Sequence, residues 1–499
     1  MGKVFILVWP KNLNRMKKFF LFILIFESIF MNAQAPLKFY TRFGGSGHDI
    51  GYGVIQTLNG QYAVTGSTGS FGNGNSDVYL AFVDSMGWVR WEKSYGGVNN
   101  DIGRSIIQLA DSGFVIAGYS NSMGNGGYDV FVVRTDKNGN LIWQKTYGGL
   151  DWDFGYEVKT SPGGDSLIVA GSTYSFGYGK LDGYILKLDL NGNKQWQKTY
   201  GGPEDDEFKS FVRTYNNQYA FAGTTKSMGD VKGDAWLVKT GLAGDSVFSY
   251  KYGTSNKKQF INQINENPYT NNFHVCGGYD SLGVDSSWAM ILILNQNGAL
   301  QSNFIHSYHE QNDEQYLANV HFRGNEFFYI RKSIKSNSDH REEPMISIFD
   351  NEVYVATTKY GSLDDDQLYC ISKTKEKGAI CVGYTKGYGA ELSDVFLLKL
   401  DSTSLLGSTS VIGIKESPDI KDQWSVYPSF TTDEINIRIE DSKNEITIFI
   451  TDCLGHVVNQ SSTHFSNTRL NLSSLAEGIY FVTLSAAYRS QTFKIIKTN

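Results

Sequence analysis

Short apolar segments alternate with glycine-rich polar turns through most of the chain. Residues 95–147 give a clear example, because a continuous apolar segment at 114–119 lies between stretches in which apolar and polar residues alternate. Apolar segments of this length, bounded by turn residues, predict β-strands. We predict four antiparallel strands and no helix in this part of the chain, at residues 104–109, 114–119, 129–135 and 141–147.

The same arrangement recurs with a period of about 52 residues. In each copy an aromatic residue precedes a glycine-rich turn, at Phe43, Tyr95, Tyr147, Tyr200, Tyr252, Tyr308 and Tyr360. All-β repeats of four strands predict the blades of a β-propeller. The seventh copy ends after its third strand at residues 394–401, and residues 37–43 have the register of the missing fourth strand. We therefore predict an all-β, seven-bladed propeller over residues 36–407, closed by its N-terminal strand.

The repeat resembles the seven-bladed propeller repeats of secreted bacterial proteins. The resemblance is carried by residues 143–149 (WQKTYGG) and by residues 129–139, and it extends over roughly residues 37–407. It implies a fold and leaves the function open, because propellers serve many roles.

A second all-β segment follows a polar linker at residues 408–423. Strands at a different spacing in residues 424–499 predict a small immunoglobulin-like β-sandwich. This segment resembles the C-terminal sorting domain that sends Bacteroidetes-type proteins through the type IX secretion system. The resemblance is carried by residues that include Pro428, Gly455, Gly478, Tyr480 and Lys494. It implies contact with the secretion machinery and release from the cell or attachment to its surface; a generic adhesion module is the alternative.

The N-terminus predicts export. Lys17 and Lys18 precede an apolar stretch at residues 19–30, and small residues follow it, as in a signal peptide. Residues 1–35 are therefore interpreted as an upstream extension and a signal peptide that starts at Met16. The apolar stretch is too short to span a membrane, and no other stretch predicts a transmembrane helix. The formal net charge of −6 argues against a nucleic-acid partner.

Four cysteines are too few for a disulfide framework. Cys276 is expected to be a buried free thiol. Cys370 and Cys381 fall on paired strands of one hairpin in a diagonal register, which leaves both a disulfide and two free thiols open.

Acidic residues recur six positions after the motif aromatic. The series is Asp49, Asp101, Asp153, Asp206, Glu314 and Asp366, and the fifth copy has Lys258 instead of an acid. A ring of carboxylates near a central channel is a candidate site for calcium, although no calcium motif supports it and no other cofactor is evident. The alternative is structural: each carboxylate accepts N–H groups of its own loop. A second acidic series begins the third strands, and we expect it to be structural too.

Aromatic residues in the loops of one face are the candidate ligand contacts. They are Tyr128, Trp152, Tyr174 and Tyr178, because exposed aromatic rings stack on ligands and their polar atoms form hydrogen bonds. Trp152 is the leading candidate, since most copies have no aromatic residue at its position. Copies five and six lose glycines and acquire residues such as Trp288 and His321, which marks either a second ligand patch or decay of the repeat.

No catalytic motif is present in the sequence. The composition and motifs favour a secreted or cell-surface, non-catalytic propeller that binds a glycan or a protein partner. Two alternatives stay open: an extracellular enzyme that cleaves polysaccharides with carboxylates of one face, and a purely structural surface protein.

Overall fold

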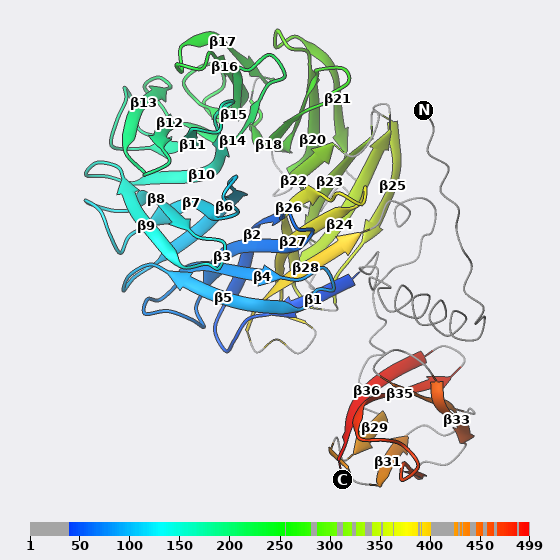
Figure 1. Ribbon diagram of the computed structural model, residues 1–499. Coiled ribbons are helices and arrows are strands. Elements are labelled where there is room, and N and C mark those ends of the chain that lie inside the picture. The colour runs from blue at the N-terminus through cyan, green and yellow to red at the C-terminus, as the bar shows by residue number, and fades with distance from the viewer. Residues whose placement is uncertain are drawn as a thin grey trace, which may run out of the picture. The chain divides into compact units, whose positions relative to one another are not determined.

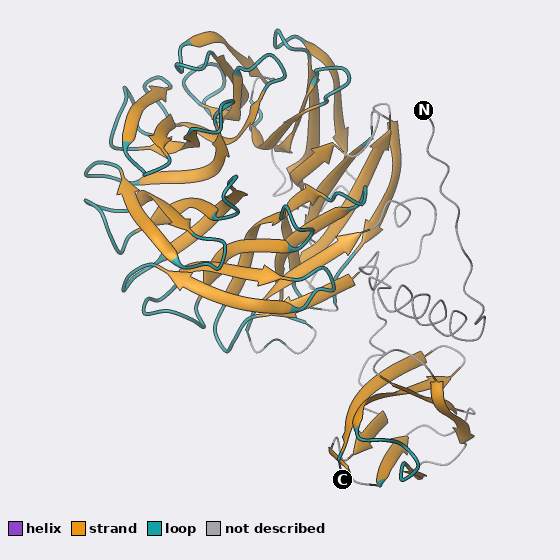
Figure 2. Cartoon of the chain, viewed as in Figure 1, coloured by secondary structure: helices purple, strands orange, loops and turns teal. Residues whose placement is uncertain are grey.

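The computed structural model describes residues 39–400 and 424–498, apart from short gaps at 255, 281–286, 307–312, 322–325, 335–341, 351–352, 363, 388–389, 391, 428–429, 432, 440–445, 453–456, 464–466 and 487–488. The chain divides into two compact units, Met1–Ile414 and Lys415–Asn499. Every regular element of the described residues is a β-strand (Figures 1 and 2). The predicted signal peptide and linker lie outside the described residues.

The first unit contains seven four-stranded antiparallel sheets (Figure 1). Sheet 1 consists of β2 (Asp49–Gln56), β3 (Tyr62–Thr68), β4 (Asp77–Val83) and β5 (Val89–Tyr95). Sheet 2 consists of β6 (Asp101–Gln108), β7 (Phe114–Ser120), β8 (Asp129–Thr135) and β9 (Leu141–Tyr147). Sheet 3 consists of β10 (Asp153–Thr160), β11 (Ser166–Thr173), β12 (Asp182–Asp189) and β13 (Lys194–Tyr200). Sheet 4 consists of β14 (Asp206–Arg213), β15 (Tyr219–Thr225), β16 (Asp234–Thr240) and β17 (Ser246–Tyr252).

The remaining sheets follow the same order. Sheet 5 consists of β18 (Gln259–Glu266), β19 (Phe273–Asp280), β20 (Ser287–Leu294) and β21 (Leu300–His306). Sheet 6 consists of β22 (Asp313–His321), β23 (Phe327–Ile334), β24 (Glu342–Asp350) and β25 (Val353–Lys359). Sheet 7 consists of β26 (Asp366–Lys373), β27 (Ala379–Thr385), β28 (Asp394–Leu400) and, from the start of the chain, β1 (Phe39–Phe43).

The strand from the start of the chain is the outer strand of sheet 7. β1 pairs antiparallel with β28, with Phe39 opposite Lys399 and Phe43 opposite Val395. One apolar cluster joins this sheet to the first one, because Val382 of sheet 7 packs with Val54 of sheet 1. Burial of apolar surface between neighbouring sheets is the main stabilising term in such a ring. The fold class is thus the predicted all-β propeller type.

A β-bulge interrupts the innermost strand of every sheet. In sheet 2 the register shifts between Gly103 and Ser105, so Arg104 is the extra residue. The glycine of the second strand that faces the bulge is required by close packing: a Cβ on Gly118 would lie 1.7 Å from the carbonyl oxygen of Ile102. Six sheets have glycine at this position, and sheet 6 has Arg331. The bulge matters for function because it redirects a side chain at the inner wall.

The aromatic motif joins each of sheets 1 to 4 to the next one by a hydrogen bond. The Tyr147 hydroxyl donates to the carbonyl oxygen of Gly192 at 2.6 Å, and Tyr95 donates in the same way to Gly139. Gly192 has a φ of +75° in the hairpin turn of the next sheet, and Trp143 leaves no room for a Cβ there. The tryptophan, the tyrosine and the turn glycine of the repeat therefore form one contact between sheets.

The second unit is a sandwich of two sheets. One sheet has the order β29 (Trp424–Tyr427), β31 (Glu434–Ile439) and β34 (Asn467–Asn471); the other has β30 (Phe430–Thr431), β36 (Arg489–Lys497), β35 (Gly478–Ala486), β32 (Ile446–Asp452) and β33 (Val457–Thr463). Ile435, Ile448 and Val482 are among the residues that form its shared core. Of the sorting-motif residues, Gly478 begins β35, the Tyr480 hydroxyl donates to the Ala476 carbonyl oxygen at 2.8 Å, and Lys494 lies in β36. Pro428 and Gly455 lie outside the described residues.

The described cysteines are free thiols. Cys370 pairs with Val382 and Cys381 with Ile371, so the two are diagonal neighbours, and neither forms a disulfide. Cys276 is buried, and burial raises the pKa of its thiol to about 12. Each of these thiols is therefore inert packing material in its sheet.

Candidate functional site

The first acidic series forms hydrogen bonds within its own loops. Asp153 is fully buried at the start of β10, where its Oδ2 accepts the Gly149 N–H at 2.8 Å and the Ser175 hydroxyl at 2.7 Å, and its Oδ1 accepts the Thr173 hydroxyl. The glycine N–H and serine contacts recur at Asp49, Asp101 and Asp206. These are the loop bonds expected of a structural series.

The second acidic series meets the first one at four junctions between sheets, beside Gly44, Gly96, Gly148 and Gly201. Asp129 begins the third strand of sheet 2 and accepts the Asn125 N–H at 2.8 Å. A Cβ on Gly148 would lie 2.0 Å from an oxygen of Asp129 and 2.4 Å from one of Asp153, so glycine is required between the two carboxylates. Burial raises the pKa of Asp129 to about 6, and the nearby Asp153 carboxylate adds to this rise. Within one sheet, an acid, a hydroxyl residue and a second acid lie side by side at the ends of the first three strands, as Asp101, Ser120 and Asp129 do in sheet 2. We call this set of three residues the polar latch of the sheet.

The polar latch is replaced in sheet 5. The exception in the fifth copy is Gln259 rather than Lys258, because the bulge register places Gln259 opposite Tyr279, where the other sheets pair an acid with Thr or Ser. Tyr279 in turn pairs with Trp288, and their rings stack with centroids 6.1 Å apart. The side chain of Glu314 in sheet 6 lies outside the described part. Among the described residues, no group of three His, Cys, Asp or Glu side chains is arranged to hold a metal ion.

A cavity of about 550 Å³ lies at the centre of the first unit. Its wall is formed by the innermost strands of all seven sheets and contains the bulge residues Tyr52, Arg104, Tyr156, Lys209, Asn262, Leu317 and Tyr369. Neither acidic series lines it, which removes the predicted carboxylate ring from the channel wall. The volume falls within the range of about 300–1,000 Å³ typical of small-molecule sites.

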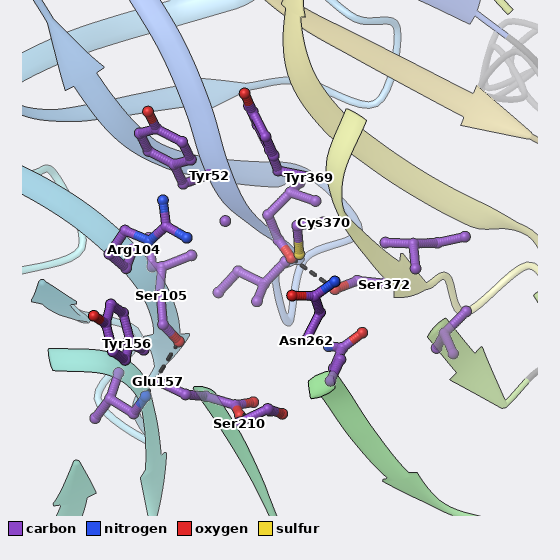
Figure 3. A pocket seen from close by; sticks show the side chains of 18 of the residues that line it. Tyr52, Arg104, Ser105, Tyr156, Glu157, Ser210, Asn262, Tyr369, Cys370 and Ser372 are labelled. Carbon is purple, nitrogen blue, oxygen red and sulfur yellow. Dashed lines mark hydrogen bonds between the residues drawn. The ribbon is translucent and has the colours of Figure 1, made fainter. Parts of the chain in front are cut away.

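Aromatic and cationic side chains meet on one side of this cavity (Figure 3). The Arg104 guanidinium lies 4.4 Å from the centroid of the Tyr52 ring, and the Tyr52 and Tyr369 rings are 5.1 Å apart. Lys209 Nζ lies 4.2 Å from the centroid of Tyr156. Cation–π contacts of this kind stabilise a cation inside a partly desolvated site.

Positive charge outweighs negative charge in the cavity wall. The only carboxylate among the lining residues is Glu157, and it is already engaged: its oxygens accept the Ser210 hydroxyl and the Phe211 N–H, each at 2.7 Å, and pair with Lys159. The lining cations are Arg104, Lys159, Lys209 and Lys373. The chain as a whole carries a formal net charge of −6, so the cavity differs in sign from the molecule around it.

An aromatic cluster connects the loop face with this cavity. Trp152 is 53% exposed, and its ring lies 6.0 Å from Tyr128 and 6.2 Å from Phe154. Phe154 stacks on Tyr156 at 6.1 Å with an interplanar angle of 8°, and Tyr156 lines the cavity. Two of the predicted ligand contacts, Trp152 and Tyr128, are thus neighbours in a row of rings that ends at the cavity.

The other predicted contacts are not part of the row of rings. Tyr174 hydrogen-bonds through its N–H to the Trp152 carbonyl oxygen, and Tyr178 is 94% exposed on the same loop of sheet 3. Trp288 packs against the apolar core between sheets 4 and 5, with its indole nitrogen buried. His274, a further buried residue of sheet 5, stacks on Phe327 with centroids 3.6 Å apart. The divergent residues Trp288 and His274 therefore serve packing.

The bulge residues carried no clear signal in the sequence. Tyr52, Arg104, Tyr156 and Lys209 differ between copies, but so do the residues beside them. The bulge itself, and with it the direction of these side chains, depends on the register between strands.

Comparisons with known proteins identify one family and several distant likenesses. Residues 425–498 match the secretion system C-terminal sorting domain, so the predicted type IX sorting domain is present. The regulatory protein FlaEY of Caulobacter vibrioides is 24% identical over 239 residues, which are 41% of this chain and 24% of that protein. The chain thus spans about a quarter of the length of this curated relative.

Two solved structures with partial similarity are both below 15% in identity. PorZ, a surface component of the type IX secretion system of Porphyromonas gingivalis, aligns with a TM-score of 0.32 and 12% identity over 88% of this chain and 64% of its own. The polysaccharide lyase Uly1 aligns with a TM-score of 0.43 and 10% identity over 71% and 90% of the two chains.

The sorting domain indicates export to the cell surface or the extracellular space. The described residues contain no helix that meets the length and apolarity needed to cross a membrane.

Proposed function

We propose that this protein is a non-catalytic propeller of the cell surface or extracellular space that binds a glycan or protein partner. The signal peptide predicted in residues 1–35 and the sorting domain are its proposed export signals. The observation that supports binding is the row of rings from Trp152 through Tyr128 and Phe154 to Tyr156, because it exposes an aromatic surface and ends at a cavity of ligand size.

The symmetry of the repeat supports the same proposal. A residue needed for folding is expected to recur in most copies, as the polar latches do outside sheet 5. Trp152 has a large exposed ring that packing does not explain, and exposed aromatic residues near a cavity are typical of binding surfaces.

Binding of the purified full chain to an array of glycans, with and without a calcium chelator, tests this proposal. We expect saturable binding without shortened products, and Trp152→Ala weakens it about tenfold. Trp88→Ala is the matched control, since Trp88 is 69% exposed in a hairpin turn of sheet 1. Shortened products would identify an enzyme, and the absence of any ligand in glycan and protein screens would leave a structural role.

A further inference from the structure

The bulge residues divide the wall of the central cavity into two unlike halves. Aromatic or cationic residues occupy this position in sheets 7, 1, 2, 3 and 4, as Tyr369, Tyr52, Arg104, Tyr156 and Lys209. In sheets 5 and 6 the same position holds Asn262 and Leu317. The fold requires a bulge in every sheet but no particular side chain on it, so the difference between the halves points to a ligand rather than to the scaffold.

Arg104 and Lys373 are the two cations of this wall that have no ion-pair partner among the described residues. The Arg104 guanidinium faces the Tyr52 ring. Lys209, by contrast, pairs with Glu207 at 2.7 Å, and Lys159 pairs with Glu157. A planar guanidinium that is held by an aromatic face and lacks a carboxylate is suited to bind a carboxylate through two parallel hydrogen bonds.

Tyrosine rings flank Arg104 on both sides. Tyr52 and Tyr369 form one aromatic wall, with centroids 5.1 Å apart, and Tyr156 stands on the neighbouring strand (Figure 3). Tyrosine combines a flat apolar face with a hydroxyl group, which is the combination that sugar rings require from a binding site. The opposite wall contains the amide side chains of Asn262, Gln263 and Asn265, each of which is hydrogen-bonded to sheet 6.

We infer that the central cavity binds a carboxylate-bearing sugar residue of an acidic glycan, with Arg104 opposite the sugar carboxylate and Tyr52, Tyr156 and Tyr369 against the ring. This inference rests on the proposed binding function and names the class of its ligand. A glycan is favoured over an acidic peptide because three tyrosine rings line the cavity near Arg104, and flat aromatic faces with hydroxyl groups suit a sugar ring.

Titration calorimetry of the full chain with tetrasaccharides of galacturonate, glucuronate and mannuronate tests the inference. At least one is expected to bind, more weakly as salt rises, and its methyl ester, which keeps the shape and removes the charge, should bind about tenfold more weakly. Arg104→Gln should reduce affinity for the acid about tenfold and leave affinity for the ester unchanged. The affinity of Arg104→Lys for the acid should lie between those of the parent protein and Arg104→Gln, because lysine keeps the charge but lacks the planar guanidinium.

Arg90→Gln is the matched control, because Arg90 is a solvent-exposed arginine of the outer strand β5, paired with Asp84. It should bind all probes like the parent protein, and thermal unfolding shows whether each variant is folded. Equal affinity for acid and ester in the unchanged protein would overturn the inference without any variant.

Two further outcomes separate this inference from the proposed function. Binding of neutral glycans only, sensitive to Trp152→Ala but not to Arg104→Gln, would preserve the binding function and overturn the acidic ligand. If the protein binds a hexaglutamate peptide and none of the uronates, the ligand is an acidic peptide and the inference of a sugar ligand is overturned. No binding to any glycan or protein would remove both proposals together.

Discussion

Sheets 2 and 5 solve the same structural problem with opposite chemistry. At the loop end of sheet 2, Asp101, Ser120 and Asp129 lie side by side on three strands and form the polar latch. The same three positions in sheet 5 hold Gln259, Tyr279 and Trp288. Hydrogen bonds to buried carboxylates hold the strand ends together in sheet 2, whereas stacked aromatic rings do so in sheet 5.

This difference shows how a repeat can lose its sequence pattern and keep its fold. A buried carboxylate is stable only if donors surround it, so the latch needs its glycine-rich loop. In sheet 5 the rings of Tyr279 and Trp288 bury apolar surface instead, and the loop no longer has to supply N–H groups. The loss of the latch in sheet 5 is therefore explained by packing, in which Trp288 takes part.

The largest effect on stability is expected from substitution of Trp288, one of the two aromatic residues that replace the polar latch in sheet 5. Trp288→Ala should destabilise the protein by about 3 kcal/mol, because it leaves a cavity at the contact between sheets 4 and 5. Chemical unfolding followed by circular dichroism measures this change. Trp152→Ala, the control, should change stability by less than about 0.5 kcal/mol, since its ring is half exposed. Equal losses in the two variants would contradict the division into a packing tryptophan and a binding tryptophan.

Much of the fold could be predicted from the sequence because its signals are local. Strands β8 and β9 begin and end at the predicted residues, since alternation and a tight turn define them. Strand β6 was predicted at residues 104–109 and runs over Asp101–Gln108. The bulge at Arg104 breaks the alternation there, and a bulge is defined only by the partner strand.

The candidate site could be predicted only in part for the same reason. Trp152 and Tyr128 stood out because they depart from the repeat, and the structure brings their rings together. Arg104 and Tyr52 gave no such signal, because their contact joins the inner strands of two sheets and arises only when the strands surround one cavity. The acidic series stood out most in the sequence, and it is scaffold.

Acid should weaken the divergent half of the ring first. His274 of sheet 5 is buried against Phe327 of sheet 6, and its Nδ1 lies 3.0 Å from the Tyr329 hydroxyl. Burial lowers the pKa of His274 to about 3, and His321 adds to the decrease. The folded state therefore disfavours protonation of His274, whereas the unfolded chain binds this proton below about pH 6.5. The contribution of His274 to stability is complete above that pH and is lost as the pH falls towards 3.

The expected loss from this histidine is about 2–3 kcal/mol between pH 6.5 and pH 4.5. Thermal unfolding across this range, compared between the parent protein and His274→Gln, measures it. The variant should be less stable at pH 7 but should lose less stability than the parent on acidification. Parallel pH profiles would show that the acid-sensitive groups lie elsewhere.

The smallest effect concerns the contact in which a motif tyrosine of one sheet donates a hydrogen bond to the turn glycine of the next. The chain contains one junction with the hydroxyl, at Tyr147, and one without it, at Phe43. The Tyr147 hydroxyl donates to the Gly192 carbonyl oxygen, whereas the equivalent residue before sheet 1 is Phe43, which has no hydroxyl. Tyr147→Phe should therefore cost about 1 kcal/mol, the net value of one hydrogen bond, and leave the ring packing unchanged. Phe43→Tyr is the reciprocal variant, and an unfolding measurement on both shows whether the contact depends on the bond or on the ring. A loss above about 3 kcal/mol for Tyr147→Phe would mean that the hydrogen bond is essential at this junction. The junction at Phe43, which lacks the bond, must then be stabilised by other contacts, such as the packing of Phe39 against Tyr62.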